Sequence, residues 1–202
     1  MLRTAAAATI LALLAGASWA ETLNFDNLSD GEVITGVDFS GVSFTVGSDD
    51  IQAADLVLRA NNIGSPVPTG FSQDIAIESS PFTNPNPFTG TFSISGVRSV
   101  SLGLGDFGAD SDSLFLTAFD GDGNTLATDT EALGAGEFSF LTLSLITTTD
   151  IASVSFGSSG AAPNSVFFDD FSFETIAVPL PAGLALLLSG LAVFGVTARR
   201  RA

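Results

Sequence analysis

Carboxylates are the most numerous side chains in this sequence that could carry out chemistry. Asp106, Asp110 and Asp112 stand close together in a glycine-containing stretch that we interpret as a loop. Calcium prefers six to eight oxygen ligands, and flexible Asp-rich loops supply them. The spacing lacks the fixed glycine and late glutamate of an EF-hand, so a solvated acidic loop is the alternative interpretation.

A second pair of carboxylates, Asp169 and Asp170, lies in the last predicted strand. Alternation places Asp169 on the same face as Phe167, Phe171 and Phe173, and Asp170 on the opposite face. A carboxylate among phenylalanines is costly unless it is hydrogen-bonded or bound to a cation. We therefore predict Asp169 as a cation ligand, with capping of backbone amides near a strand end as the alternative.

The third acidic cluster is Asp120, Asp122 and Asn124, in the sequence DGDGN. Asp, Asn and Gly tolerate positive φ, so this stretch predicts a hairpin turn. Turn formation explains these residues without a bound ion.

Several catalytic groups are missing from the sequence. The chain has no Cys, His or Tyr, and its six basic residues are all arginine. These absences exclude thiol nucleophiles, serine triads with a histidine base, Schiff-base lysines and zinc-histidine sites. Paired carboxylates leave glycoside hydrolysis as a minor alternative.

Aromatic residues limit the sugar-binding hypothesis. The one tryptophan, Trp19, precedes the predicted mature chain. Carbohydrate enzymes and lectins usually stack sugar rings on Trp or Tyr, and the predicted mature chain has neither. Phe82 or Phe88, in a proline-rich loop, would serve that role if exposed.

The net charge excludes a nucleic-acid partner. All 22 acidic residues lie between Glu21 and Glu174, and only Arg59 and Arg98 oppose them, which gives this segment a net charge of −20. Such a surface repels phosphates and anionic lipid headgroups. It is compatible with divalent cations and with solubility at high concentration.

The N-terminus has the pattern of a secretory signal peptide. Arg3 precedes an apolar run over residues 5–15, and Ser18 and Ala20 offer the small residues that a signal peptidase recognises. We predict cleavage after Ala20, so that residues 1–20 are removed and signal peptidase is a processing partner.

The C-terminus predicts a membrane-spanning helix. Residues 176–198 are predominantly apolar and carry no charge, and three arginines follow. About 20 apolar residues cross the hydrocarbon core of a bilayer, and arginines favour the cytoplasmic side. The membrane is therefore a predicted partner, with the preceding domain held on the outer side of the inner membrane. The topology-setting residues are Arg199, Arg200 and Arg201.

A short motif before this apolar run resembles the VPLPA variant of the PEP-CTERM protein-sorting signals. The resemblance covers about 25 residues and implies a sorting tail over residues 178–202, recognised by an exosortase-type peptidase in exported proteins of Gram-negative bacteria that often make extracellular polysaccharide. An unprocessed membrane anchor is the alternative. The usual Pro-Glu-Pro is replaced here by Pro-Leu-Pro. The motif residues are Val178, Pro179, Leu180, Pro181 and Ala182.

The segment between the two ends predicts one all-β domain over residues 21–177. About ten short runs rich in β-branched and aromatic residues are separated by Gly, Pro, Asn and Asp turns, which is typical of an antiparallel β-sandwich and favours a jelly roll. The phenylalanines of this segment are expected to form its core. The expected strands include 22–26, 37–46 with a bend at Gly41, 71–78, 89–94, 97–104, 113–119, 125–131, 137–146, 151–156 and 165–174.

This segment also resembles the exported β-sandwich domains that often precede PEP-CTERM tails, on the matching stretches 23–26, 105–110, 116–124 and 166–171. In many jelly-roll binding modules an Asp of the final strand joins first-strand groups in a structural calcium site. The resemblance therefore implies Asp26 as the partner of Asp169, and calcium as the candidate cofactor.

We expect from these features a cell-surface or extracellular-matrix β-sandwich without catalysis, stabilised by calcium. The alternative is a carbohydrate-binding module associated with extracellular polysaccharide, and a glycoside-active enzyme ranks below both. After tail processing, the expected location is the cell surface or the medium.

Overall fold

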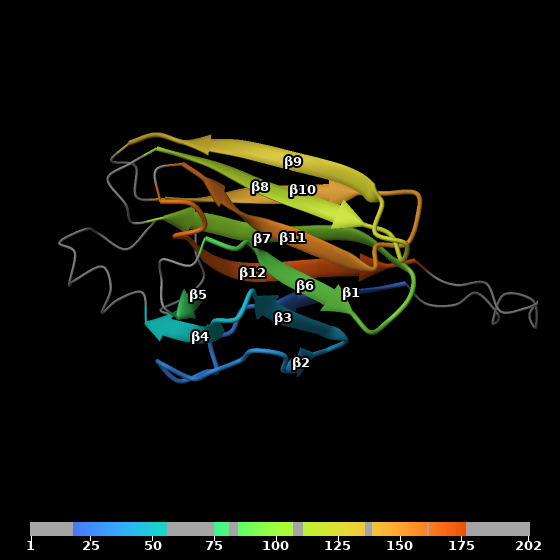
Figure 1. Cartoon of the computed structure of the whole chain (residues 1–202). Coiled ribbons are helices and arrows are strands. Elements are labelled where there is room, and N and C mark those ends of the chain that lie inside the picture. Colours follow the sequence, from blue (N-terminus) through green and yellow to red (C-terminus); the bar gives the residue numbers. More distant parts are fainter. Residues whose placement is uncertain are drawn as a thin grey trace, which may run out of the picture. The chain divides into compact units, whose positions relative to one another are not determined.

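The structure is a computed structural model that describes residues 18–55, 75–80, 85–106, 111–135, 139–160 and 162–176. Twelve strands and no helix occur in these ranges (Figure 1). The strands are β1 (Trp19–Leu23), β2 (Asp38–Phe39), β3 (Val42–Val46), β4 (Asp50–Asp55), β5 (Ile75–Ser80), β6 (Phe88–Phe92), β7 (Val97–Asp106), β8 (Asp112–Phe119), β9 (Thr125–Leu133), β10 (Ser139–Ile146), β11 (Ser153–Ser159) and β12 (Phe167–Thr175).

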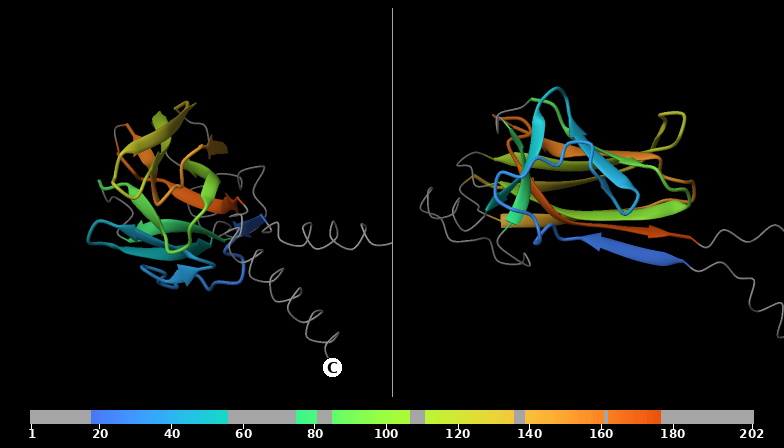
Figure 2. Two further views of the ribbon diagram at one scale, coloured as in Figure 1. Left: turned by 90° about the vertical axis from the view of Figure 1, so that its right-hand side faces the viewer. Right: turned by 90° about the horizontal axis from the view of Figure 1, so that it is seen from below.

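The strands form two six-stranded sheets. Sheet A has the order β10-β7-β12-β5-β4, with β1 paired to β12, and sheet B has the order β2-β3-β6-β11-β8-β9. Every pair whose register is resolved is antiparallel. Figure 2 shows β1 lying alongside β12. The all-β antiparallel sandwich expected from the sequence is therefore confirmed.

The core lies between the two sheets and is rich in phenylalanine. Phe44, Phe88 and Phe156 of sheet B contact Phe168 of sheet A, with ring centroids 4.9–5.3 Å apart. The Phe88 and Phe156 rings meet Phe168 edge to face, an arrangement that the ring quadrupoles favour, and the Phe44 ring is tilted against it. The prediction that phenylalanines form the core is confirmed for these residues, which are fully buried.

Strand β12 departs from the predicted alternation. The β12–β7 register shifts between Asp169 and Ser172, and Asp170 has a positive φ of 48°. This bulge inserts one residue, so Phe168 and Phe171 both enter the core cluster and Asp169 points to the outer face of sheet A. The prediction that Asp169 shares a face with Phe171 is therefore wrong.

The expected single strand over residues 37–46 is a tight hairpin. Strands β2 and β3 pair antiparallel across Ser40 and Gly41, which have φ values of 52° and 99°. The carboxylate of Asp38 accepts the Gly41 N–H at 2.8 Å and closes the turn. Gly41 is required here, because a Cβ at this position would meet the Ile94 side chain.

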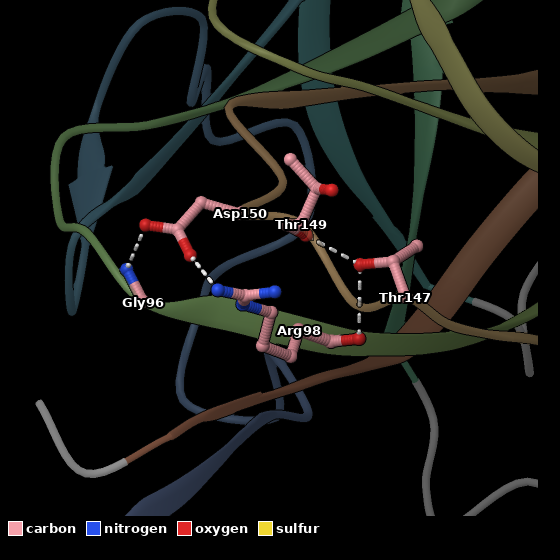
Figure 3. Close-up of polar contacts among 5 residues, drawn as sticks. All are labelled: Gly96, Arg98, Thr147, Thr149 and Asp150. Atoms are coloured by element: carbon pink, nitrogen blue, oxygen red, sulfur yellow. Dashed lines mark hydrogen bonds and ion pairs between the residues drawn. The ribbon is translucent and has the colours of Figure 1, made fainter.

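One ion pair fastens the loop between β10 and β11 to the start of β7 (Figure 3). Arg98 Nη2 lies 2.8 Å from Asp150 Oδ1, and Asp150 Oδ2 accepts the Gly96 N–H at 3.2 Å. Thr147 Oγ1 donates to the carbonyl oxygens of Arg98 and Thr149. Arg98 thus has a structural role in the described part of the sandwich.

The chain divides into two compact units. One comprises Ala20–Thr175, and the other contains the two ends of the chain. Residues 1–17 and 177–202 lie outside the described residues, so the structure leaves the signal peptide, the sorting motif and the arginine cluster as predictions. Among the residues that are described, none belongs to a helix long and apolar enough to span a membrane.

Candidate functional site

A row of hydroxyl side chains crosses the outer face of sheet B. The strand registers align Thr45 with Thr89, Thr89 with Ser155, Ser155 with Thr117, and Thr117 with Thr128. Each has an apolar neighbour along its strand that packs into the core (Phe44, Phe88, Val154, Leu116 and Ala127), so these five side chains share the outward face. Adjacent strands are about 4.8 Å apart, which gives a row about 19 Å long.

Two phenylalanines of β8 flank this row. Leu114, Leu116 and Ala118 are buried in the core, so Phe115 and Phe119 point outward, and both are half-buried. Phe119 aligns with Ser153, and Phe115 aligns with Gly157. We call the hydroxyl row with these two rings the hydroxyl face.

A glycine shapes the Phe115 side of the hydroxyl face. A Cβ at Gly157 would collide with the Asn164 side-chain oxygen and would come within 3.5 Å of the Phe115 ring. Asn164 is held there by the Ser158 N–H, which donates to Oδ1 at 3.1 Å, and by its own Nδ2, which donates to the Pro85 carbonyl at 2.6 Å. The absence of a side chain at Gly157 therefore lets Asn164 and Phe115 pack over the sheet.

Sequence reasoning missed the hydroxyl face. The expectation that the phenylalanines of the domain form its core assigns Phe115 and Phe119 to the interior, whereas both are half-buried on the outer face. The signal that could have found the face is the alternation of Ser and Thr with apolar residues in several strands. The alignment of these residues into one row depends on pairing between distant strands.

The predicted partners Asp26 and Asp169 lie within range of an electrostatic interaction. The charge of Asp26 acts on the Asp169 carboxyl group, as does that of Asp170. Asp169 is fully buried; its Oδ1 accepts the Asp170 N–H at 2.7 Å, and its Oδ2 has no hydrogen-bond partner among the described residues. Asp26 Oδ2 accepts from Asn24 Nδ2 at 2.7 Å.

Burial dominates the electrostatics of this pair. Loss of hydration is the main cause that raises the pKa of Asp169 to about 8. The Asp170 N–H lowers this pKa, and the nearby charges of Asp170 and Asp26 raise it. The carboxyl group is therefore protonated at neutral pH unless a cation replaces the proton. A buried carboxyl oxygen without a partner fits a cation ligand.

A second buried carboxylate lies on the same face of sheet A. Ile77 pairs with Phe168 and both side chains are in the core, so Glu78 points outward like Asp169. Glu78 is 1% exposed, and its Oε1 accepts from Gln52 Nε2 at 3.5 Å. Within the described ranges, no group of three or more Asp, Glu, His or Cys side chains is placed to hold a metal ion. A cation at Asp26 and Asp169 would therefore need backbone and water oxygens to complete its shell.

The structure describes only part of the predicted loop site. Asp112 is buried at the start of β8, and its Oδ1 lies 2.8 Å from the position that a Cβ on Gly160 would take. The side chains of Asp106 and Asp110 lie outside the described residues, so the site formed by these three stays a prediction.

Hydrogen bonds explain the DGDGN hairpin, as predicted. Asp120 Oδ1 accepts the N–H groups of Asp122 and Asn124 at 3.0 and 2.8 Å, and Asn124 Nδ2 donates to Asp120 Oδ2 at 3.0 Å. Donors from Asn124 are the main cause of a lowered pKa at Asp120.

Two further predicted positions can be located. Phe88 is fully buried against Phe156, so the proposal that it stacks on sugar is wrong, whereas Phe82 lies outside the described residues. Ser18 and Ala20, the predicted signal-peptidase positions, are exposed, and Ala20 lies within β1.

Comparison with known proteins gives structural neighbours only. No family model and no curated protein matches the chain. An arabinose-bound MgGH51 α-L-arabinofuranosidase matches with a TM-score of 0.49 and 14% identity over 78% of this chain, which spans 27% of the enzyme. The C-terminal family 22 carbohydrate-binding module of Clostridium thermocellum Xyn10B matches with a TM-score of 0.45 and 12% identity, over 80% of this chain and 96% of the module.

The family 29 carbohydrate-binding module CBM29_1 of Piromyces equi also matches, with a TM-score of 0.40 and 5% identity, over 79% of this chain and 91% of the module. Because these scores and identities are low, the account of this chain rests on its own geometry.

Proposed function

We propose that this protein is a non-catalytic carbohydrate-binding module and that the hydroxyl face binds neutral polysaccharide. The observation that carries the proposal is the row of five hydroxyl side chains in register across five strands. Each hydroxyl both donates and accepts hydrogen bonds, as sugar hydroxyl groups do. Phe115 and Phe119 add apolar surface on both sides of the row, where the C–H faces of sugar rings can pack.

The charge distribution specifies a neutral ligand. The segment from Glu21 to Glu174 has a net charge of −20, which repels polyuronates and sulfated chains. The row itself holds only Ser and Thr. The face therefore offers hydrogen bonding without charge repulsion to a neutral chain and supplies no acid or base for hydrolysis.

The hydroxyl groups are partly pre-oriented. Thr117 Oγ1 and Thr128 Oγ1 are 3.1 Å apart and hydrogen-bonded to each other. Both residues sit on strands fixed by pairing on either side or by the hairpin at Asp120. A preformed row loses little conformational entropy when a ligand binds.

The proposal also covers the location of the protein and the connectivity of its strands. It includes a jelly-roll connectivity, a signal peptide over residues 1–20 and a sorting tail over residues 178–202. In this account the protein is exported and held by its C-terminal helix, and an exosortase-type peptidase releases it to the cell surface or the extracellular matrix. Extracellular polysaccharide is then the nearest ligand.

A structural cation is the second part of the proposal. Asp26 and Asp169 would hold calcium beside β12, and the orphaned Asp169 Oδ2 supports this. A ligand that binds only the folded chain stabilises it by about 2.7 kcal/mol when its free concentration is about 100 times the dissociation constant. This stabilisation raises the unfolding midpoint. Calcium at millimolar concentration should raise the midpoint of the wild type and of Asp122→Ala, but not that of Asp26→Ala or Asp169→Ala. An unchanged wild-type midpoint would remove calcium from the account.

Affinity gel electrophoresis of the purified full-length chain tests carbohydrate binding. Hydroxyethyl cellulose, xylan and galactomannan serve as neutral probes, and alginate as the anionic one. We expect retardation in at least one neutral gel and none in alginate, and Phe119→Ala should weaken the retardation. Ile146→Ala, which removes an 83% exposed side chain elsewhere, is the matched control. Equal migration of the wild type in all gels would overturn the proposal.

A further inference from the structure

The outer face of sheet A contains a polar hollow on the opposite side of the sandwich from the hydroxyl face. It has a volume of about 200 Å³ and is formed by β1, β7 and β12. Hydroxyl groups of Thr22, Ser99, Ser101 and Ser172 line it. Its two carboxylates, Glu21 and Glu174, complete a wall of hydrogen-bonding groups.

The strand alternation explains why this hollow is polar. Val100 and Leu102 of β7 point into the core, so Ser99 and Ser101 point outward. The bulge at Asp170 has the same effect in β12, because it places Phe171 and Phe173 inward and therefore Ser172 outward. The bulge in β12 thus places the Ser172 side chain in the lining of the hollow.

Two hydrogen bonds fix the side chains that β1 contributes to the hollow. Thr22 and Ser172 share a hydrogen bond of 2.8 Å between their hydroxyl oxygens. Glu21 Oε1 accepts from Ser40 Oγ at 2.9 Å, which leaves its second carboxylate oxygen available. Glu21 is half-buried and Glu174 is exposed. The predicted cleavage after Ala20 removes Ala20, which also lines the hollow, and keeps Glu21 and Thr22.

The chemistry of the hollow fits a single neutral sugar ring. Carboxylates accept hydrogen bonds from adjacent sugar hydroxyls, and serine and threonine hydroxyls both donate and accept. Pockets for drug-sized ligands measure about 300–1,000 Å³, so this smaller hollow suits one ring of a chain. Two carboxylates disfavour uronate, phosphate or sulfate groups.

We propose that this hollow is a second carbohydrate subsite and that one molecule bridges two neutral polysaccharide chains. The inference rests on the proposed function, since the hydroxyl face supplies the first contact. The two sites occupy opposite outer faces of the sandwich, so a polysaccharide chain bound at one site leaves the other site accessible. Bridging of this kind would link strands of an extracellular matrix.

The test uses the neutral polysaccharide that retards the wild type, and it measures both retardation and solution viscosity. A bivalent protein should raise the viscosity of a dilute polysaccharide solution at substoichiometric amounts. Glu174→Gln combined with Ser101→Leu should abolish this rise while retardation persists, weakened by about tenfold or more as avidity is lost. Thr148→Leu in an exposed loop is the control and should behave as the wild type.

The outcomes separate the two proposals. Retardation without a wild-type viscosity rise, or a rise that survives in the double variant, overturns the second subsite and leaves the hydroxyl face. No retardation of the wild type overturns both. The thermal unfolding midpoint of the double variant checks its fold. If the double variant is unstable, Glu174→Gln alone, which keeps the side-chain shape, should still reduce the rise in viscosity.

Discussion

The two outer faces of this sandwich use polar residues in opposite ways. On sheet B, hydroxyl groups form an accessible neutral row, whereas on sheet A two carboxyl groups, Asp169 and Glu78, are almost completely buried. The difference teaches that acidic residues do not mark the hydroxyl face, although two carboxylates line the polar hollow on the outer face of sheet A. The accessible row can exchange water for sugar, while the buried Asp169 carboxyl group holds a proton or a cation.

The pH dependence of stability should give the largest difference between the faces. Asp169 holds its proton in the folded chain up to a pKa of about 8, but ionises near 3.8 when unfolded. The folded chain thus binds one more proton at Asp169 in this window. The contribution of Asp169 to the free energy of unfolding is therefore largest below about pH 4 and falls by up to about 1.4 kcal/mol per pH unit towards pH 8. Denaturant unfolding at several pH values measures this slope.

The substitution Asp169→Asn should remove most of this slope, because the amide cannot ionise. Asp122→Asn, in the exposed hairpin, should leave it unchanged. Saturating calcium should also flatten the wild-type slope, since the cation replaces the proton. A slope that persists in Asp169→Asn would mean that another group is responsible for it.

A charge placed in the centre of the hydroxyl row should give the next largest effect. Thr117→Asp introduces an anion that must lose water when sugar binds, so retardation by neutral polysaccharide should weaken by about tenfold or more. Thr148→Asp carries the same charge in an exposed loop and should bind as the wild type does. Equal losses in both variants would indicate a general charge effect and would contradict a specific role for the row.

The alternation of apolar residues predicted much of the fold but little of the site. Strands such as β8 and β11 follow from local patterns, and the proximity of Asp26 and Asp169 was expected from the family resemblance. The outward position of Asp169 was not predicted, because nothing in the stretch Phe-Asp-Asp-Phe indicates a bulge with positive φ at a non-glycine residue. The hydroxyl row was also missed, because strand order and register are set by the whole chain.

The smallest effect should come from the ion pair that belongs to neither face. Asp150 is half exposed and bonds Arg98 and the Gly96 N–H, so Asp150→Asn should destabilise the fold by about 1 kcal/mol or less. Polysaccharide retardation should be unchanged at temperatures where the variant is folded. Loss of retardation in this variant would show that binding depends on the β10–β11 loop and would weaken the contrast between the faces.

The most direct test of the central claim is an NMR titration of the isotopically labelled chain with a hexasaccharide of the neutral polysaccharide that retards the wild type in affinity gels. The account predicts dose-dependent shifts in the backbone amides of Thr89, Ser155 and Thr117, with smaller or no shifts for core residues. The absence of shifts at these three residues would contradict the hydroxyl face as the carbohydrate site, whether the oligosaccharide binds elsewhere or does not bind.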